Sequence, residues 1–140
     1  MSEPHNVSLV IDRWIAKAEN DLVAAQQILK LDQTCPFEVV CFHAQQSAEK
    51  FIKAVLLFRG VSFSKTHDLV DLSVSLAEKD SKQFDSGDLA QLSAYSVDSR
   101  YPSDLIVDRS EAEEAVKIAS QVKRACLAIL GRQPVQPYGC

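Results

Sequence analysis

The stretch "HAQQSAEKFIKAVLLFRG", residues 43–60, carries the strongest helical pattern in the chain. Its apolar residues recur at steps of three and four, which is typical of the buried face of a helix: Ala44, Ala48, Phe51, Ile52 and Val55. Pro36 before the stretch and Gly60 after it bound the pattern, since proline is tolerated in a first turn and glycine is common just after a last turn. We therefore predict one helix of ~24 residues, which would be ~36 Å long.

Two faces of this predicted helix need a partner. Its polar residues form one broad stripe: His43, Gln45, Gln46, Glu49, Lys50 and Lys53. The stripe is either a solvated face, with a Glu49–Lys53 ion pair worth a few tenths of a kcal/mol, or a ligand-binding surface. After Lys53 the helix is apolar on every side, so either the next loop, through Val61 and Phe63, or a second subunit covers it. Three residues are accordingly expected at a dimer or partner surface: Leu56, Leu57 and Phe58.

The rest of the chain also has helical periodicity. Apolar stripes or capping residues predict further helices over about residues 8–30, from Thr66 to about Lys82, from 86–88 into Tyr101, and from 108–110 to Gly131. The chain has 140 residues, 46% of them hydrophobic, and only four glycines and five prolines, which favours one helical domain over many short strands. We predict an all-α protein, an up-and-down antiparallel bundle of four to five helices over 8–131, with flexible ends at 1–7 and 132–140.

Charge and cysteine spacing exclude several kinds of protein. A net charge of −4 argues against a protein that coats long nucleic acid through a basic face. The four cysteines lack the spacing of a zinc site, and no N-terminal apolar run resembles a secretory signal. No apolar run approaches the ~20 residues needed to cross a bilayer. These features predict a cytoplasmic protein with no metal or cofactor and with reduced thiols, a disulfide bridge being the alternative.

Three segments carry a family resemblance. The run "FHAQQSAEKFIKAVLLFRGVSFSKTHDL", residues 42–69, resembles the signature of the HEPN family, in which a Gln-Gln-x-x-Glu-Lys helix leads to a glycine and then to a Thr-His-Asp-Leu helix start. "NDLVAAQQIL", residues 20–29, and "SRYPSD", residues 99–104, are also similar to that pattern. The resemblance covers about residues 9–130, in the expected order.

The resemblance implies a helical bundle that is commonly a homodimer and is often encoded beside a minimal nucleotidyltransferase that it binds. Many HEPN proteins are metal-free ribonucleases that use an arginine followed, after four to six residues, by a histidine. Arg100 matches the arginine. The three allowed places for the histidine hold Leu105, Ile106 and Val107.

This gap favours a binding protein over a ribonuclease. RNA cleavage through the 2′-hydroxyl needs a group with a pKa near the working pH, which histidine supplies most readily. Asp104 is the only titratable group close by, and an ordinary aspartate is a poor proton donor at neutral pH. We therefore predict a non-catalytic module that binds a nucleotide or RNA phosphate, a nucleotidyltransferase, or both, in a toxin–antitoxin-like pair. The alternative is a divergent ribonuclease that combines Arg100 with His43 or His67.

The candidate ligand-binding residues are Arg100, Tyr101, Lys50, Lys53, Gln46 and His67. Arg100 offers a planar fork for phosphate, and Tyr101 offers a ring on which a base can stack. Each also has a structural interpretation, in which Arg100 pairs with Asp98 or Asp104, Tyr101 fills the bundle end and His67 holds a turn together. A purely structural dimer, whose polar stripe contacts only water, is the third possibility. Trp14 is expected in the core.

Overall fold

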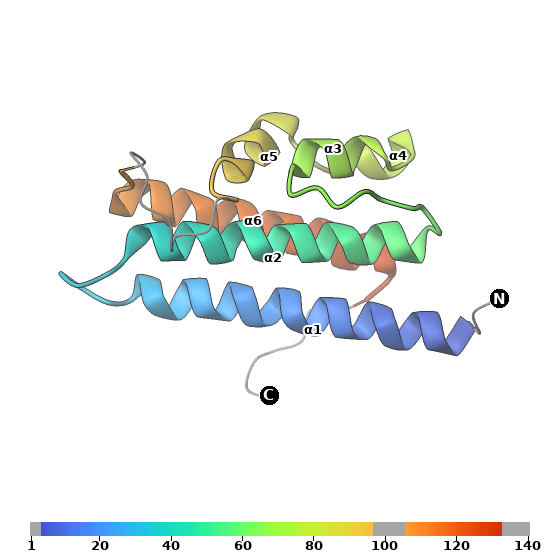
Figure 1. Ribbon diagram of the computed structural model, residues 1–140, viewed down its shortest axis with the longest axis horizontal. Helices are drawn as coiled ribbons and strands as arrows, with labels where there is room; N and C mark the ends of the chain where they lie inside the picture. Colours follow the sequence, from blue (N-terminus) through green and yellow to red (C-terminus); the bar gives the residue numbers. More distant parts are fainter. Residues whose placement is uncertain (1–3, 97–105, 133–140) are drawn as a thin grey trace.

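The computed structural model describes residues 4–96 and 106–132, and the 43–60 stretch forms most of its central helix, α2 (Phe37–Phe58) (Figure 1). α2 packs most extensively against α1 (Pro4–Leu29) and α6 (Arg109–Leu130). The largest fully buried side chains of α2 are Phe51, Ile52 and Leu56. The prediction that this stretch builds the core is therefore confirmed.

The three long helices do not all alternate in direction. α1 and α2 are antiparallel, since His43 contacts Asp21 and Lys53 lies beside Trp14. α6 is also antiparallel to α1, because Arg109 at its start contacts the end of α1, and Arg132 just after it contacts Asp12 near the start of α1. Consequently α2 and α6 run in the same direction. Of the short helices between them, α3 and α4 lie toward the end of the bundle where α2 finishes, and α5 lies nearer the end where α6 begins (Figure 1).

Three short helices replace two of the predicted ones. The predicted helix from Thr66 to about Lys82 is two helices, α3 (Leu69–Val74) and α4 (Glu78–Ser81). Asp68 caps α3 by accepting bonds from the backbone N–H groups of Val70 and Asp71, so the cap lies two residues after the predicted Thr66. α5 (Ser86–Ser93) begins where predicted but ends earlier. With the three long helices, these make six described helices rather than four to five.

The long helices end at residues whose chemistry explains the boundary. Gly60 and Gly131, which follow α2 and α6, each have a φ of 69°, a left-handed conformation that glycine adopts without strain. At the end of α1, the guanidinium of Arg109 donates to the backbone oxygens of Leu29, at 3.0 Å, and Leu31, at 2.8 Å. The bond to Leu29 satisfies a carbonyl that the helix itself leaves unpaired, and the bond to Leu31 holds the turn that follows.

The described residues contain no strand, so the all-α prediction is confirmed. α1 begins at Pro4, which extends the predicted helix toward the N-terminus; proline is well suited to a first helical position. None of the described helices is both long and apolar enough to span a membrane.

Candidate functional site

The polar stripe of α2 is largely built into the fold. Glu49 is only 4% exposed and lies at the centre of a network that we call the Glu49 network: Gln45, Glu49, Lys53 and His67. One carboxylate oxygen of Glu49 accepts from Lys53 Nζ at 3.0 Å, and the other accepts from Gln45 Nε2 at 3.2 Å and lies 2.9 Å from His67 Nδ1. Gln45 also donates to the backbone oxygen of His67 at 3.0 Å. The network therefore fastens the segment before α3 to α2.

Burial and hydrogen bonding act in opposite directions on Glu49. Burial alone would raise the pKa of its carboxyl group, but the hydrogen bonds from His67, Lys53 and Gln45 stabilise the carboxylate. Together they outweigh burial and lower the pKa below its ordinary value of 4.5. Glu49 is thus a buried anion at neutral pH, and it contacts Nδ1 of the His67 imidazole.

A second network joins α2 to α1 around Asp21. His43 Nδ1 lies 3.0 Å from one carboxylate oxygen of Asp21, and Lys50 Nζ donates to the other. Ser47, on the same face of α2, donates to the backbone oxygen of Ala18 at 2.8 Å. The side chains of His43 and Lys50 are 30% and 23% exposed. Both residues therefore contact α1 through Asp21 and remain partly accessible to solvent.

Lys53 is enclosed rather than solvated. Its ammonium nitrogen lies 5.9 Å from the ring centre of Trp14 and 5.6 Å from that of Phe63, and Glu49 holds it from a third side. A cation close to aromatic rings and a carboxylate is stabilised without water. Only 11% of the Lys53 side chain is exposed, so this ammonium is a poor partner for an external phosphate. Trp14, predicted in the core, is half-buried and packs against it.

Some of the predicted ligand residues lie in the part of the chain that the structure describes, and the others do not. Gln46 donates to the side-chain oxygen of Gln45 at 2.8 Å, which places it at the edge of the Glu49 network. His67 is the most exposed of the predicted ligand residues that the structure describes, with 65% of its side chain open. The prediction of a wholly solvated stripe is wrong for Gln45, Glu49 and Lys53, which are buried.

The other predicted residues lie outside the part of the chain that the structure describes. These are Arg100, Tyr101 and Asp104, together with Leu105, the first of the three places where the ribonuclease histidine would stand. The other two places are described. Ile106 is 88% exposed, and Val107 is half-buried against the core. Both side chains are aliphatic, so neither can transfer a proton.

The apolar end of α2 is covered partly by its own chain. Val61 and Phe63 pack against the core, as one of the two alternatives predicted. Leu56 is 0% exposed, which corrects its assignment to a partner surface. Leu57 is half-buried, and Phe58 keeps 45% of its surface open. Of the three residues proposed for a dimer or partner surface, Phe58 is the most available.

The described residues contain no metal cluster, and the Cys41 thiol is unreactive. No group of three or more histidine, cysteine or acidic side chains among them could hold a metal ion. Burial raises the pKa of the Cys41 thiol to about 12, with smaller contributions from Glu111, Glu38 and Asp108. A thiol with this pKa is not a nucleophile near neutral pH.

Sequence reasoning missed Asp21 and the central role of Glu49. Glu49 was predicted only as half of a surface ion pair, because helical spacing shows which residues share a face but not what packs on that face. One available signal was the Thr66-His67-Asp68 helix start, since a histidine beside a helix start can reach a neighbouring helix. Asp21 lies on the α2-facing side of α1 among apolar residues, which was a second signal.

Comparisons with known proteins agree with the fold. Residues 11–129 match the family model described as "HEPN domain". The crystal structure of TT1696 from Thermus thermophilus is similar, with 27% sequence identity and a TM-score of 0.71 over 85% of this chain and 97% of that one. The archaeal HEPN homologue ST0689 shares the fold at 24% identity and a TM-score of 0.62, over 86% of this chain and 95% of that one. No curated protein matches. Because the family model covers most of its length, this chain belongs to the HEPN domain family.

Proposed function

We propose that this chain is a non-catalytic HEPN module that binds the phosphate of a nucleotide or RNA. In this proposal Arg100 supplies the planar fork for the phosphate and Tyr101 the ring for a base, and Gln46, Lys50 and His67 are further ligand residues. The observation that carries the proposal is the sequence after Arg100, where Leu105, Ile106 and Val107 leave no proton-transfer group.

The geometry of α2 supports binding by some of these residues more than by others. His67 is exposed and its ring is oriented by Glu49, so its other nitrogen is available to a ligand at the surface. Lys50 contacts one carboxylate, but an ammonium has three hydrogens to donate and this one is partly exposed. Lys53 is left out of the proposed ligand set, because Glu49, Trp14 and Phe63 enclose it.

A divergent ribonuclease is the second candidate, and one contact favours it. The buried Glu49 carboxylate lies 2.9 Å from Nδ1 of the exposed His67. A carboxylate in this position fixes the tautomer and orientation of an imidazole, which then acts as a general base through its other nitrogen. In that case His67 would supply the proton transfer and Arg100 would stabilise the charge on the phosphate.

The two candidates differ in what they do to RNA. We expect a mixed RNA pool to stay intact with the purified protein in EDTA, while fluorescence anisotropy reports binding of a labelled oligoribonucleotide. The Arg100→Ala variant should bind about tenfold more weakly, which corresponds to about 1.4 kcal/mol. Lys79→Ala, which removes one exposed positive charge from α4, should leave binding unchanged. Cleavage that both Arg100→Ala and His67→Gln abolish would establish the ribonuclease instead, and no binding would refute the proposal.

We further propose that the chain forms a homodimer, with a minimal nucleotidyltransferase as a second protein partner. The open face of Phe58, at the end of α2, supports an apolar contact. Light scattering should give about twice the 15.5 kDa chain mass, and Phe58→Ser should lower it. A mass of one chain at high concentration would refute the dimer.

A further inference from the structure

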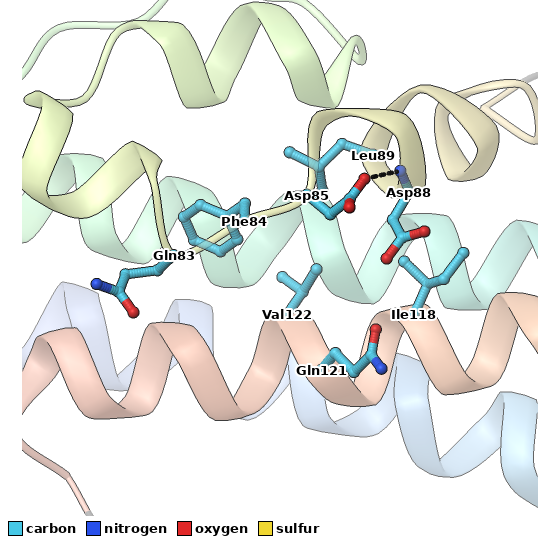
Figure 2. Close-up of a pocket in the computed structure, with 8 residues that line it drawn as sticks. All are labelled: Gln83, Phe84, Asp85, Asp88, Leu89, Ile118, Gln121 and Val122. Carbon is cyan, nitrogen blue, oxygen red and sulfur yellow. Dashed lines mark hydrogen bonds between the residues drawn. The ribbon is translucent and has the colours of Figure 1, made fainter.

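A small hollow lies between α5 and α6, away from the polar stripe of α2 (Figure 2). Its volume is about 190 Å³. Ligand pockets for small molecules usually measure about 300–1,000 Å³, so this one suits a single side chain better than a whole metabolite. The lining comes from the segment before α5, from α5 and from α6: Gln83, Phe84, Asp85, Asp88, Leu89, Ile118, Gln121 and Val122.

The hollow combines an apolar floor with hydrogen-bond acceptors at its rim. Figure 2 shows Ile118 and Val122 rising from α6 toward the space below the Phe84 ring. In the same view Asp88 on α5 and Gln121 on α6 extend toward each other across the opening. Asp85 adds a second carboxylate, although one of its oxygens already accepts from the backbone N–H of Asp88 at 3.0 Å.

The charge of this hollow is entirely negative. None of the described residues that line it is basic. A metal ion is a poor occupant, because the described residues contain no cluster of three metal-ligating side chains. The remaining fit is an organic cation on an apolar stem, which buries the stem against the floor and pairs the charge at the rim.

We propose that this hollow is a docking pocket for an arginine side chain of a basic protein partner. The guanidinium would donate to the Asp88 carboxylate and to the Gln121 amide oxygen, and its planar fork matches two acceptors better than an ammonium does. Arginine seated in a desolvated pocket is a common anchor of protein interfaces. A basic partner is favoured over a second copy at this hollow, because a second copy carries the same net charge of −4 and is less complementary to two carboxylates.

Titration with a short peptide tests this inference separately from phosphate binding. The probe is acetyl-Gly-Gly-Arg-Gly-Gly-amide, and the readout is the amide NMR spectrum of the ¹⁵N-labelled protein. We expect shifts confined to residues 83–89 and 118–122, with a dissociation constant on the order of a few millimolar. The same peptide with lysine should bind more weakly, and the peptide with neutral citrulline should cause no shifts.

Isosteric variants identify the groups responsible. Asp88→Asn should weaken binding at least about fivefold. Asp85→Asn should weaken it less, because one oxygen of Asp85 already accepts from the backbone N–H of Asp88. Asparagine keeps this helix cap, so the fold should be unchanged. Glu113→Gln removes an exposed charge elsewhere on α6 and should change nothing. Shifts outside the hollow, equal binding of the citrulline peptide, or full binding by Asp88→Asn would each overturn the proposal. So would self-association that Asp88→Asn abolishes, since the pocket would then serve a second copy.

Discussion

Replacing Glu49 with glutamine should destabilise the protein by about 3 kcal/mol, although the side chain keeps its shape. Glu49 is 4% exposed and is the counter-ion of Lys53, whose side chain is 11% exposed. Removing one partner of a buried ion pair leaves the other charge desolvated and unpaired, which costs ~3–5 kcal/mol. The residual exposure of Lys53 places the expected loss at the lower end. Since small domains have ~5–15 kcal/mol in total, urea unfolding followed by circular dichroism will resolve the difference.

A second substitution separates the ion pair from the packing. In the double variant Glu49→Gln/Lys53→Met the unpaired ammonium is gone, and methionine fills the space beside Trp14 and Phe63. We expect its stability to return to within about 1 kcal/mol of the wild type, because a buried ion pair is often no better than an apolar pair. If Glu49→Gln unfolds at the wild-type urea concentration, the Glu49 network contributes nothing to the fold.

The same carboxylate makes stability depend on pH. The pKa of Glu49 is lower in the folded protein than its ordinary value of 4.5, so the folded state binds fewer protons than the unfolded state around that pH. Its contribution is therefore fully present above about pH 4.5 and is lost as the pH falls through the folded pKa. The urea midpoint should fall more steeply in acid for the wild type than for Glu49→Gln. Parallel profiles would show that other carboxylates dominate.

The fold was predictable because each long helix carries its own boundaries and its own apolar stripe. Pro36 and Gly60 bound α2, and Asp108 and Gly131 bound α6, at almost the predicted positions. The break between α3 and α4 was not predictable from periodicity. Short helices are stabilised by tertiary contacts such as the Arg59–Asp80 pair, in which two nitrogens of Arg59 contact Asp80 at 2.7 and 3.1 Å.

The candidate site was predictable only in part. The sequence shows that the polar residues of α2 share one side of the helix, but not that they divide between the Glu49 network and the contacts to Asp21. Whether Glu49 faces water or another segment depends on the path of residues 60–68, and a one-helix pattern contains no information about that path. Conversely, the lack of a histidine after Arg100 is a property of the sequence alone, and it is the reason why we propose binding rather than cleavage.

Leu56 and Phe58, at the apolar end of α2, also show that the pattern of one helix does not predict which of its residues are exposed. Both belong to a run that is apolar on all sides, yet Leu56 is 0% exposed and Phe58 is 45% exposed. We expect Leu56→Ala to lower the free energy of unfolding by ~2–5 kcal/mol, because it removes buried methyl groups and leaves a cavity. Phe58→Ala, the matched control, should lower it by less than about 1 kcal/mol.

Protein concentration distinguishes a core residue from an interface residue. A core defect acts within one chain, so the drop in the urea midpoint for Leu56→Ala should be the same at low and high protein concentration. An interface defect acts through dissociation and diminishes as concentration rises, because association stabilises the folded state by mass action. If the loss for Leu56→Ala disappears at high concentration, Leu56 lies between two subunits. If instead the stability loss of Phe58→Ala diminishes as the protein concentration rises, the two residues have the roles that their exposure indicates. Leu56 then stabilises the single chain, and Phe58 contacts the second subunit.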